Sequence, residues 1–261
     1  MDLGLKGKVA IVGGASKGLG RACAEVLAAE GATVVMCSRT AADLERAAQE
    51  IRSATRAEVH AFGGDLESNA TIEALVKTAV DRYGRCDILV NNSGGPPLAK
   101  AVSATEEQWA VAVQRSLVYF SRMARAGLPH MQRQKSGRII NILASTVYQP
   151  IANLALSGAT RMGVVAFAKS LADEVGRDGI LVNNVCPGSL LSERMLANVT
   201  ARAKELGISL ETALAQRAEE TSLGRIGDYT LLEALDPAGP GELFRARDLR
   251  RGRTVVLRLL P

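Results

Sequence analysis

Residues 9–20 read Val9-Ala10-Ile11-Val12-Gly13-Gly14-Ala15-Ser16-Lys17-Gly18-Leu19-Gly20. The first four residues are apolar and mostly β-branched, which predicts a buried strand. Gly14, Gly18 and Gly20 follow at G-x-x-x-G-x-G spacing and lead into a helical pattern. Glycine allows the backbone to approach a pyrophosphate closely, and a helix N-terminus supplies oriented N–H groups. The stretch therefore predicts a turn that binds a dinucleotide.

The alternation of strand and helix patterns continues over the first two thirds of the chain. Short β-branched runs predict strands at 9–12, 33–37, 58–62, 88–90, 138–143 and 180–185. Longer amphipathic stretches predict helices at 19–29, 41–53, 69–83, 106–127 and 159–175. Strands that alternate with helices in this way form βαβ units with a parallel sheet. We therefore expect an α/β fold with a Rossmann-type, doubly wound parallel sheet in three layers (α/β/α).

Composition bounds the class of protein. The chain has 261 residues, of which 47% are hydrophobic, so it can bury a sizeable core. It has no apolar run long enough to span a bilayer and no leader-like start, which predicts a cytoplasmic protein without a membrane partner. The net charge of +5 is dispersed and aromatic residues make up only 3%, which argues against a nucleic-acid partner.

The sequence offers no pattern typical of a metal site. The two histidines, His60 and His130, are far apart, and there is no C-x-x-C pair. Each of the four cysteines lies inside or beside an apolar segment: Cys23, Cys37, Cys86 and Cys186. We therefore expect reduced thiols and no metal centre.

Residues 5 to about 227 resemble the short-chain dehydrogenase/reductase family of nicotinamide-dependent oxidoreductases. Besides the glycine-rich turn, the resemblance rests on Asp65-Leu66, on the Asn91-Asn92-Ser93-Gly94 turn, and on Val185-Cys186-Pro187-Gly188 followed by Ser192. The nearest family label is a 3-oxoacyl-carrier-protein-reductase-like protein. The resemblance implies a nicotinamide cofactor and a small-molecule carbonyl or hydroxyl substrate.

The resemblance also implies which residues hold the cofactor. In the family, the pair at 65–66 contacts adenine, the turn at 91–94 lines the cofactor with its backbone, and the Pro-Gly segment at 187–188 faces the nicotinamide. Ser192 stands where the family usually has threonine. The expected cofactor-binding residues are Gly14, Ser16, Lys17, Gly18, Leu19, Gly20, Ser38, Arg39, Asp65, Leu66, Asn92, Gly94, Pro187, Gly188 and Ser192.

The end of the second predicted strand indicates which nicotinamide cofactor is used. Ser38 stands where an NAD-preferring member would carry a carboxylate for the ribose hydroxyls. Without that carboxylate a 2′-phosphate is not repelled, and Arg39 and Lys17 can pair with it. The cofactor is therefore predicted to be NADP.

The family's proton donor is the tyrosine of a Tyr-x-x-x-Lys pair, and this chain lacks both residues. Residues 157–161 read Ser-Gly-Ala-Thr-Arg, so Ser157 stands at the tyrosine position and Arg161 at the lysine position. The two share a helix face, but arginine does not relay a proton as lysine does. The family's carbonyl-binding serine falls by spacing on Ala144. We take Ser145 as the candidate, together with Ser157 and Arg161.

Two further positions bear on the chemistry. The asparagine that usually follows the helix tryptophan, here Trp109, by seven residues is replaced by Ser116. Tyr148 is either a displaced acid or an ordinary surface tyrosine. Two functions therefore remain open: an NADP-dependent oxidoreductase with an atypical Ser/Arg site, and a non-catalytic NADP-binding sensor or assembly protein.

The last third divides into two segments. Residues 192–222 are polar and rich in alanine, and they form either the family's substrate lid or a solvated helix pair. Residues 1–228 are the expected cofactor-binding domain, and 229–261 are an atypical C-terminal tail.

The tail resembles the first strands of a protein-kinase N-lobe, in which only Gly241 matches the glycine-rich loop. It lacks the catalytic loop and the metal-binding motifs, which excludes kinase activity. We prefer a degenerate gene end over a chance resemblance. Prolines and glycines at 236–241 predict that the family's last sheet strand is not rebuilt in the usual way, although 254–260 could add an edge strand. A homo-oligomer is possible, since family members assemble partly through this region.

Overall fold

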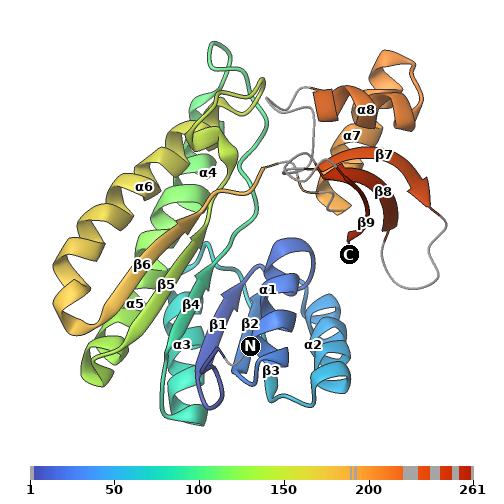
Figure 1. Cartoon of the computed structure of the whole chain (residues 1–261). Helices are drawn as coiled ribbons and strands as arrows, with labels where there is room; N and C mark the ends of the chain where they lie inside the picture. Colours follow the sequence, from blue (N-terminus) through green and yellow to red (C-terminus); the bar gives the residue numbers. More distant parts are fainter. Residues whose placement is uncertain are drawn as a thin grey trace. The chain divides into compact units, whose positions relative to one another are not determined.

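A computed structural model of the chain describes residues 3–188, 190, 193–219, 229–235, 242–248 and 253–259 (Figure 1). By their contacts the residues divide into two compact units, Met1–Gly188 and Ser189–Pro261. The sequence predicts a boundary at residue 228, between the family domain and the tail, whereas the contacts divide the chain between residues 188 and 189. It stays a prediction.

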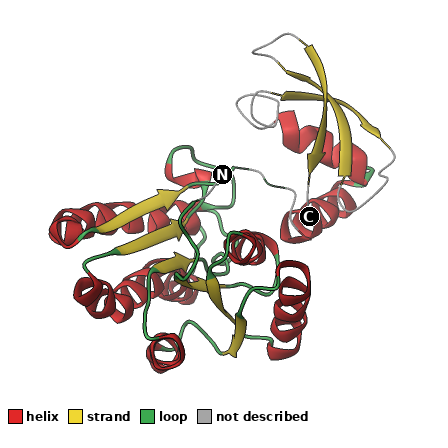
Figure 2. Cartoon of the chain, turned by 60° about the horizontal axis from the view of Figure 1, so that its bottom comes forward, coloured by secondary structure: helices red, strands yellow, loops and turns green. Residues whose placement is uncertain are grey.

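The first unit is built around a six-stranded parallel sheet with the order β3-β2-β1-β4-β5-β6. This order confirms the predicted Rossmann-type fold, and Figure 2 shows helices on both sides of the sheet. The strands are β1 (Val9–Gly13), β2 (Thr33–Ser38), β3 (Val59–Gly63), β4 (Ile88–Asn91), β5 (Gly137–Ile142) and β6 (Ile180–Val185).

The helices of this unit follow the predicted pattern with one difference. They are α1 (Gly18–Ala29), α2 (Ala41–Thr55), α3 (Asn69–Tyr83), α4 (Glu106–Val113), α5 (Tyr119–Gln134) and α6 (Ala155–Val175). The helix predicted at 106–127 is instead interrupted by the π-helical segment η1 (Gln114–Val118) and continues to Gln134. A π-helical segment inserts an extra residue into a helix and is frequent at functional sites. It leaves no periodicity signal that a sequence reading could use.

The core lies on both faces of the sheet because successive residues of a strand point to opposite sides. On β1, Ile11 belongs to the cluster under α3, α5 and α6, whereas Val12 belongs to the cluster under α1 and α2. Both are fully buried. A parallel sheet covered on both faces needs nearly continuous apolar strands, which the β1 sequence supplies.

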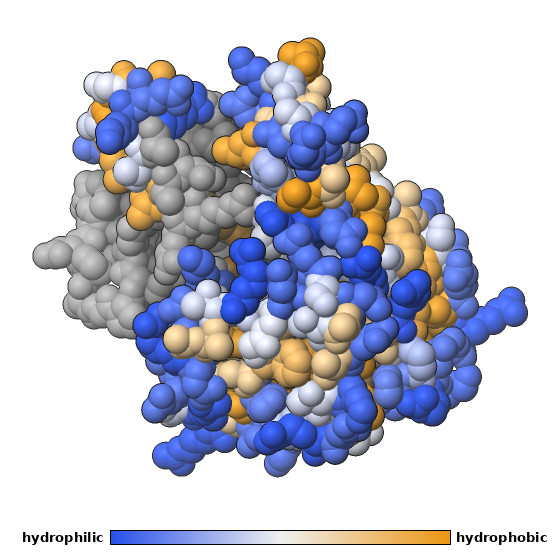
Figure 3. Space-filling model, turned by 180° about the vertical axis from the view of Figure 1, so that it is seen from behind, coloured by the Kyte–Doolittle hydropathy of each residue, from blue (hydrophilic) through white to orange (hydrophobic). Residues whose placement is uncertain are grey.

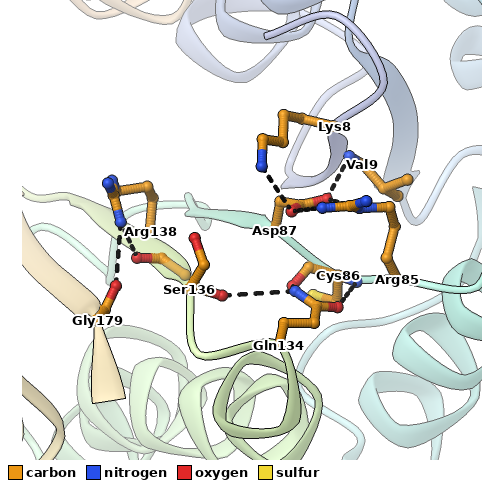
Figure 4. A network of polar contacts seen from close by, with 10 residues as sticks. Lys8, Val9, Arg85, Cys86, Asp87, Gln134, Ser136, Arg138 and Gly179 are labelled. Carbon is orange, nitrogen blue, oxygen red and sulfur yellow. Dashed lines mark hydrogen bonds and ion pairs between the residues drawn. The ribbon is translucent and has the colours of Figure 1, made fainter. Parts of the chain in front are cut away.

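A buried carboxylate ties the amino end of the sheet together (Figure 4). Asp87, directly before β4, is only 4% exposed. It accepts hydrogen bonds from the backbone N–H of Val9 at 2.9 Å and from the Arg85 guanidinium at 2.6 Å, and Lys8 Nζ lies 3.5 Å away. This network joins the start of β1 to the start of β4, at the end of the sheet opposite the predicted cofactor turn.

The second unit holds two helices and a small sheet. Helices α7 (Glu193–Leu206) and α8 (Leu210–Glu219) pack together through Val199, Ala203 and Ala213. Strands β7 (Tyr229–Leu235), β8 (Glu242–Asp248) and β9 (Arg253–Leu259) form an antiparallel sheet in that order.

The tail does form strands, but not as an extension of the large sheet. The segment expected as a possible edge strand, 254–260, does form one: β9 pairs with β8 and lies at the edge of the small sheet. Short connections between consecutive strands favour this local antiparallel pairing over a distant sheet edge. Among the described residues, β6 is the last strand of the large sheet, so the family's last strand is indeed not rebuilt in the usual way.

Candidate active site

The glycine-rich turn lies at the carboxyl end of β1, where the side chain of Asn92 holds it. Asn92 Nδ2 donates to the carbonyl oxygens of Gly13 at 3.1 Å and Gly14 at 3.4 Å. A Cβ placed on Gly20 would lie 2.3 Å from the carbonyl oxygen of Gly14. Gly20 is therefore required for the close packing of α1 against the turn, as the spacing predicted.

The N-terminus of α1 has features that suit the binding of an anion. Gly14 and Gly18 have φ of +57° and +58°, a region that favours glycine. A Cβ on Gly18 would meet nothing within 4 Å, so the space in front of it is open. Lys17, in the N-cap position, makes no side-chain cap, and the first turn contains no acidic residue. The first N–H groups of α1 thus face an open side, beside half-buried Ser16 and exposed Leu19.

The carboxyl end of β2 combines a buried hydroxyl with an exposed cation. Ser38 is 9% exposed, and its hydroxyl has no hydrogen-bond partner among the described residues. Arg39 follows it and is exposed. An orphaned buried hydroxyl beside a guanidinium fits the hydroxyl or phosphate oxygens of an adenosine ribose.

The loop after β3 lies beside the turn. Leu66 Cδ1 is 3.1 Å from the Cβ position of Gly13, and Asp65 accepts a hydrogen bond from the Glu67 N–H at 3.0 Å. Burial, with the charge of Asp65 as the second cause, raises the pKa of the Cys37 thiol to about 12. Cys37 is therefore an inert core thiol, as expected.

The loop after β4 is fixed by η1. Ser93 Oγ donates to the carbonyl oxygen of Arg115 at 3.0 Å, and Arg115 pairs with Glu67 at 2.7 Å. These contacts hold the turn that contains Asn92 and exposed Gly94 against the loop after β3. The glycine-rich turn and the loops after β2, β3 and β4, which were predicted to line the cofactor, therefore all lie at the carboxyl ends of the parallel strands.

The two residues at the tyrosine and lysine positions lie on α6. Ser157 and Arg161 are each 5% exposed and one helical turn apart. Arg161 Nη1 donates to the carbonyl oxygen of Ile142 at 2.9 Å, which ties α6 to the end of β5. The buried guanidinium places a permanent positive charge close to the carboxyl edge of the sheet.

The 3₁₀ segment η2 (Ser145–Val147) follows β5 and connects it to the loop after β6. The N–H of Ser145 donates to the carbonyl oxygen of Pro187 at 2.9 Å, and Ser145 is half-buried. Pro187 is half-buried and Gly188 is exposed. Ala144, which the family spacing aligns with the carbonyl-binding serine, offers no hydroxyl. Ser192 lies outside the described residues.

Two buried hydroxyls near these elements were not predicted as site residues. Ser116, inside η1, is fully buried, and Thr146, inside η2, is 8% exposed. Neither hydroxyl has a hydrogen-bond partner among the described residues. The departure of Ser116 from the family's asparagine was the available signal, whereas nothing in the sequence singled out Thr146.

Two polar side chains act on the thiol of Cys186. Burial raises the pKa of its thiol most strongly, while a hydrogen bond with the Tyr148 hydroxyl and the positive charge of Arg161 act in the opposite direction. Tyr148, directly after η2, is 82% exposed. Tyr148, in the turn after η2, and Arg161, on α6, thus both lower the pKa of this thiol, although burial outweighs them.

Within the described residues, no group of three or more His, Cys, Asp or Glu side chains is arranged to hold a metal ion. Over the same residues, every helix is too short or too polar to cross a bilayer.

Comparison with known proteins gives consistent matches. Residues 8–204 match the model of a family described as short chain dehydrogenase. The chain is 35% identical over 227 residues to a 3-oxoacyl-acyl-carrier-protein reductase of Vibrio cholerae, covering 87% of this chain and 86% of that protein. It is 33% identical over 214 residues to the D-beta-hydroxybutyrate dehydrogenase of Cupriavidus necator, covering 80% and 81%. The solved structure of L-sorbose reductase from Gluconobacter frateurii, complexed with NADPH and L-sorbose, matches with a TM-score of 0.82 at 30% identity, covering 87% and 86%.

Proposed function

The chain belongs to the short-chain dehydrogenase family of NAD(P)-dependent oxidoreductases, and we propose that it uses NADP and transfers hydride between this cofactor and a carbonyl or hydroxyl substrate through an atypical active site. The solved structure of the similar L-sorbose reductase contains NADPH and L-sorbose. The 3-oxoacyl-acyl-carrier-protein reductase of Vibrio cholerae acts on a carbonyl compound. Both relatives support the substrate class.

The proposed preference for NADP rests on two residues at the end of β2. Ser38 supplies a buried hydroxyl without a partner among the described residues, and Arg39 supplies an exposed guanidinium. A carboxylate at this position would repel a 2′-phosphate, whereas a serine and an arginine would bind it. Lys17, at the start of α1, adds a second cation on the same predicted side of the cofactor.

The remaining predicted residues would have the following roles. The N–H groups at the start of α1 would hold the diphosphate of NADP, and Arg161 would bond to the ribose hydroxyls or stabilise charge at the reacting oxygen. Ser145 and Ser157 would donate hydrogen bonds to the substrate oxygen. NADPH, when bound, would supply the hydride.

Binding of the two cofactors tests this function. We expect NADPH to bind more tightly than NADH by about 10- to 100-fold, because one charge-assisted contact contributes roughly 1.5 to 3 kcal/mol. Fluorescence titration measures both affinities. Arg39→Ala should weaken the binding of NADPH and leave the binding of NADH unchanged.

Arg46→Ala, which removes an exposed arginine from α2, is the matched control and should change neither affinity. Equal affinity of the wild-type protein for NADPH and NADH would refute the preference. Tight binding of NADPH without oxidation by any ketone would favour the second candidate, a non-catalytic cofactor-binding protein. The absence of a tyrosine and a lysine at positions 157 and 161 is the observation that keeps this candidate open.

Several predictions about the whole protein rest on the sequence alone. A cytoplasmic location, a lid at 192–222 and a homo-oligomer are proposals of this kind. The family match ends at residue 204. The suggested origin of 229–261 as a degenerate protein-kinase fragment therefore depends on its own short sequence.

A further inference from the structure

We propose that Tyr148 donates the proton to the carbonyl oxygen of the substrate, in place of the tyrosine that Ser157 replaces. The proposal rests on the oxidoreductase function and names a further catalytic residue for it. Transfer of a hydride to a carbonyl carbon leaves charge on the oxygen, so a proton donor must lie close to the carbon that is reduced. A phenol is a far better donor for this purpose than the aliphatic hydroxyl of a serine.

The position of Tyr148 in the fold fits this role. Its N–H donates to the carbonyl oxygen of Ser145 at 2.9 Å, and the Ser145 N–H donates to the carbonyl oxygen of Pro187 at 2.9 Å. The turn that carries Tyr148 is therefore tied to the segment predicted to face the nicotinamide. The Tyr148 hydroxyl also acts on Cys186, the residue before Pro187: it lowers the pKa of that thiol, against the larger effect of burial, which raises it. The backbone contacts thus hold the turn that carries Tyr148 at the carboxyl end of β6.

The other tyrosines whose side chains are described do not fit. Tyr119 is 1% exposed, its hydroxyl donates to the carbonyl oxygen of Asn92 at 3.3 Å, and burial raises its pKa strongly. Tyr83, on α3, donates to Glu58 before β3, at the opposite end of the sheet from the glycine-rich turn. Tyr148, at 82% exposure, is accessible from solvent.

Arg161 supplies the cation that a phenolic acid needs beside it. Its guanidinium donates to the carbonyl oxygen of Ile142 at the end of β5, the strand that precedes the Tyr148 turn. Its positive charge lowers the pKa of the Cys186 thiol, as the Tyr148 hydroxyl also does, against the larger effect of burial. A nearby cation stabilises the phenolate that remains after the proton has left. In the usual family arrangement the acid and the cation lie on one helix. Here they would come from the turn after β5 and from α6.

The reaction balances without another reactant. As the carbonyl carbon accepts the hydride, the electron pair of the C=O π bond moves to the oxygen, which takes the proton from the Tyr148 hydroxyl. The O–H bond of the phenol breaks, and the alcohol O–H bond forms. Water then returns a proton to the exposed phenolate.

The test compares Tyr148→Phe with the wild-type protein. The substrate is acetoacetyl-N-acetylcysteamine, a 3-oxoacyl thioester, and bound NADPH is oxidised in a single turnover at matched occupancy. We expect Tyr148→Phe to lower the rate about 10²- to 10⁴-fold with an unchanged Kd for NADPH.

Tyr83→Phe, which removes a tyrosine hydroxyl far from this site, should keep the wild-type rate. A Tyr148→Phe variant within threefold of an active wild type would overturn the role of Tyr148 and leave the oxidoreductase function intact. A loss of rate accompanied by a tenfold weaker Kd for NADPH would also overturn it, since the side chain would then be structural. A wild type that binds NADPH and reduces neither this thioester nor ethyl acetoacetate would overturn both the role and the function.

Discussion

At the scale of single residues, the buried Asp87 decides how firmly the amino end of the sheet is held. Burial alone would raise the pKa of its carboxyl, but hydrogen bonds from Arg85 and the Val9 N–H, together with the charges of Arg85 and Lys8, lower it. A lowered pKa in the folded state stabilises the fold above the carboxyl's pKa in the unfolded chain. That stabilisation is lost as the pH falls through the folded pKa.

We expect Asp87→Asn to lower the free energy of unfolding at pH 7 by about 2 to 3 kcal/mol, because three donors lose a charged acceptor. The difference between variant and wild type should shrink as the pH falls below about 4. Urea denaturation between pH 3 and pH 7 measures it. Asp81→Asn, which breaks an exposed i, i+4 pair with Lys77, should cost less than about 0.5 kcal/mol. A pH-independent difference for Asp87→Asn would contradict the assignment.

In the candidate site, the positions of some residues could be predicted from the sequence and those of others could not. Ser157 and Arg161 could be placed on one face of α6 because residues four apart on a helix always share one. The neighbours Tyr148 and Cys186 are 38 positions apart and follow two different strands. Their contact depends on how the turns after β5 and β6 close, and neither turn has a periodic pattern.

At the scale of secondary-structure elements, three asparagines join the last three strands of the large sheet. Asn91, Asn141 and Asn184 occupy paired register positions on β4, β5 and β6. Asn91 Nδ2 donates to Asn141 Oδ1 and Asn141 Nδ2 donates to Asn184 Oδ1, both at 2.9 Å. The middle residue therefore serves as acceptor on one side and as donor on the other.

Asn141→Leu should lower the free energy of unfolding by about 2 to 4 kcal/mol, because it leaves a buried donor on Asn91 and an acceptor on Asn184 without partners. Asn184→Leu should cost less, since Asn184 is half-buried on the edge strand and only one bond is lost. Chemical denaturation of the two variants gives the order. An Asn184→Leu variant as unstable as Asn141→Leu would show that the chain of amides does not act as described.

The elements themselves were largely predictable, and their pairing was only partly so. All six strands of the large sheet appear where β-branched runs predicted them. The βαβ alternation also predicted correctly that these strands run parallel. The asparagine register was not predictable, because register depends on contacts between strands far apart in the chain. Residues 254–260 show the same limit: the composition predicted a strand, which is present, but could not indicate its partner β8.

At the scale of the whole molecule, the last strand of the large sheet among the described residues, β6, itself carries none of the usual features that prevent a sheet edge from pairing. β6 reads Ile180-Leu181-Val182-Asn183-Asn184-Val185, without a charge or a proline, and it is the last strand of that sheet among the described residues. Leu181 is 49% exposed and Val185 is 45% exposed. On the face that Figure 3 shows, apolar surface gathers in patches between charged areas. Natural sheet edges usually carry lysine, proline or a bulge, and an edge without them is prone to pair.

We therefore expect the protein to self-associate in solution through β6, and a lysine on each exposed apolar position of that strand to prevent it. The double variant Leu181→Lys/Val185→Lys should have a lower mass than the wild type at the same concentration, because two such edges would bring four cations together in antiparallel pairing. Light scattering during size-exclusion chromatography measures the mass. Val102→Lys, at a loop residue that is 94% exposed, should keep the wild-type mass. A wild type that stays monomeric at every concentration, or a double variant with an unchanged mass, would contradict pairing through β6.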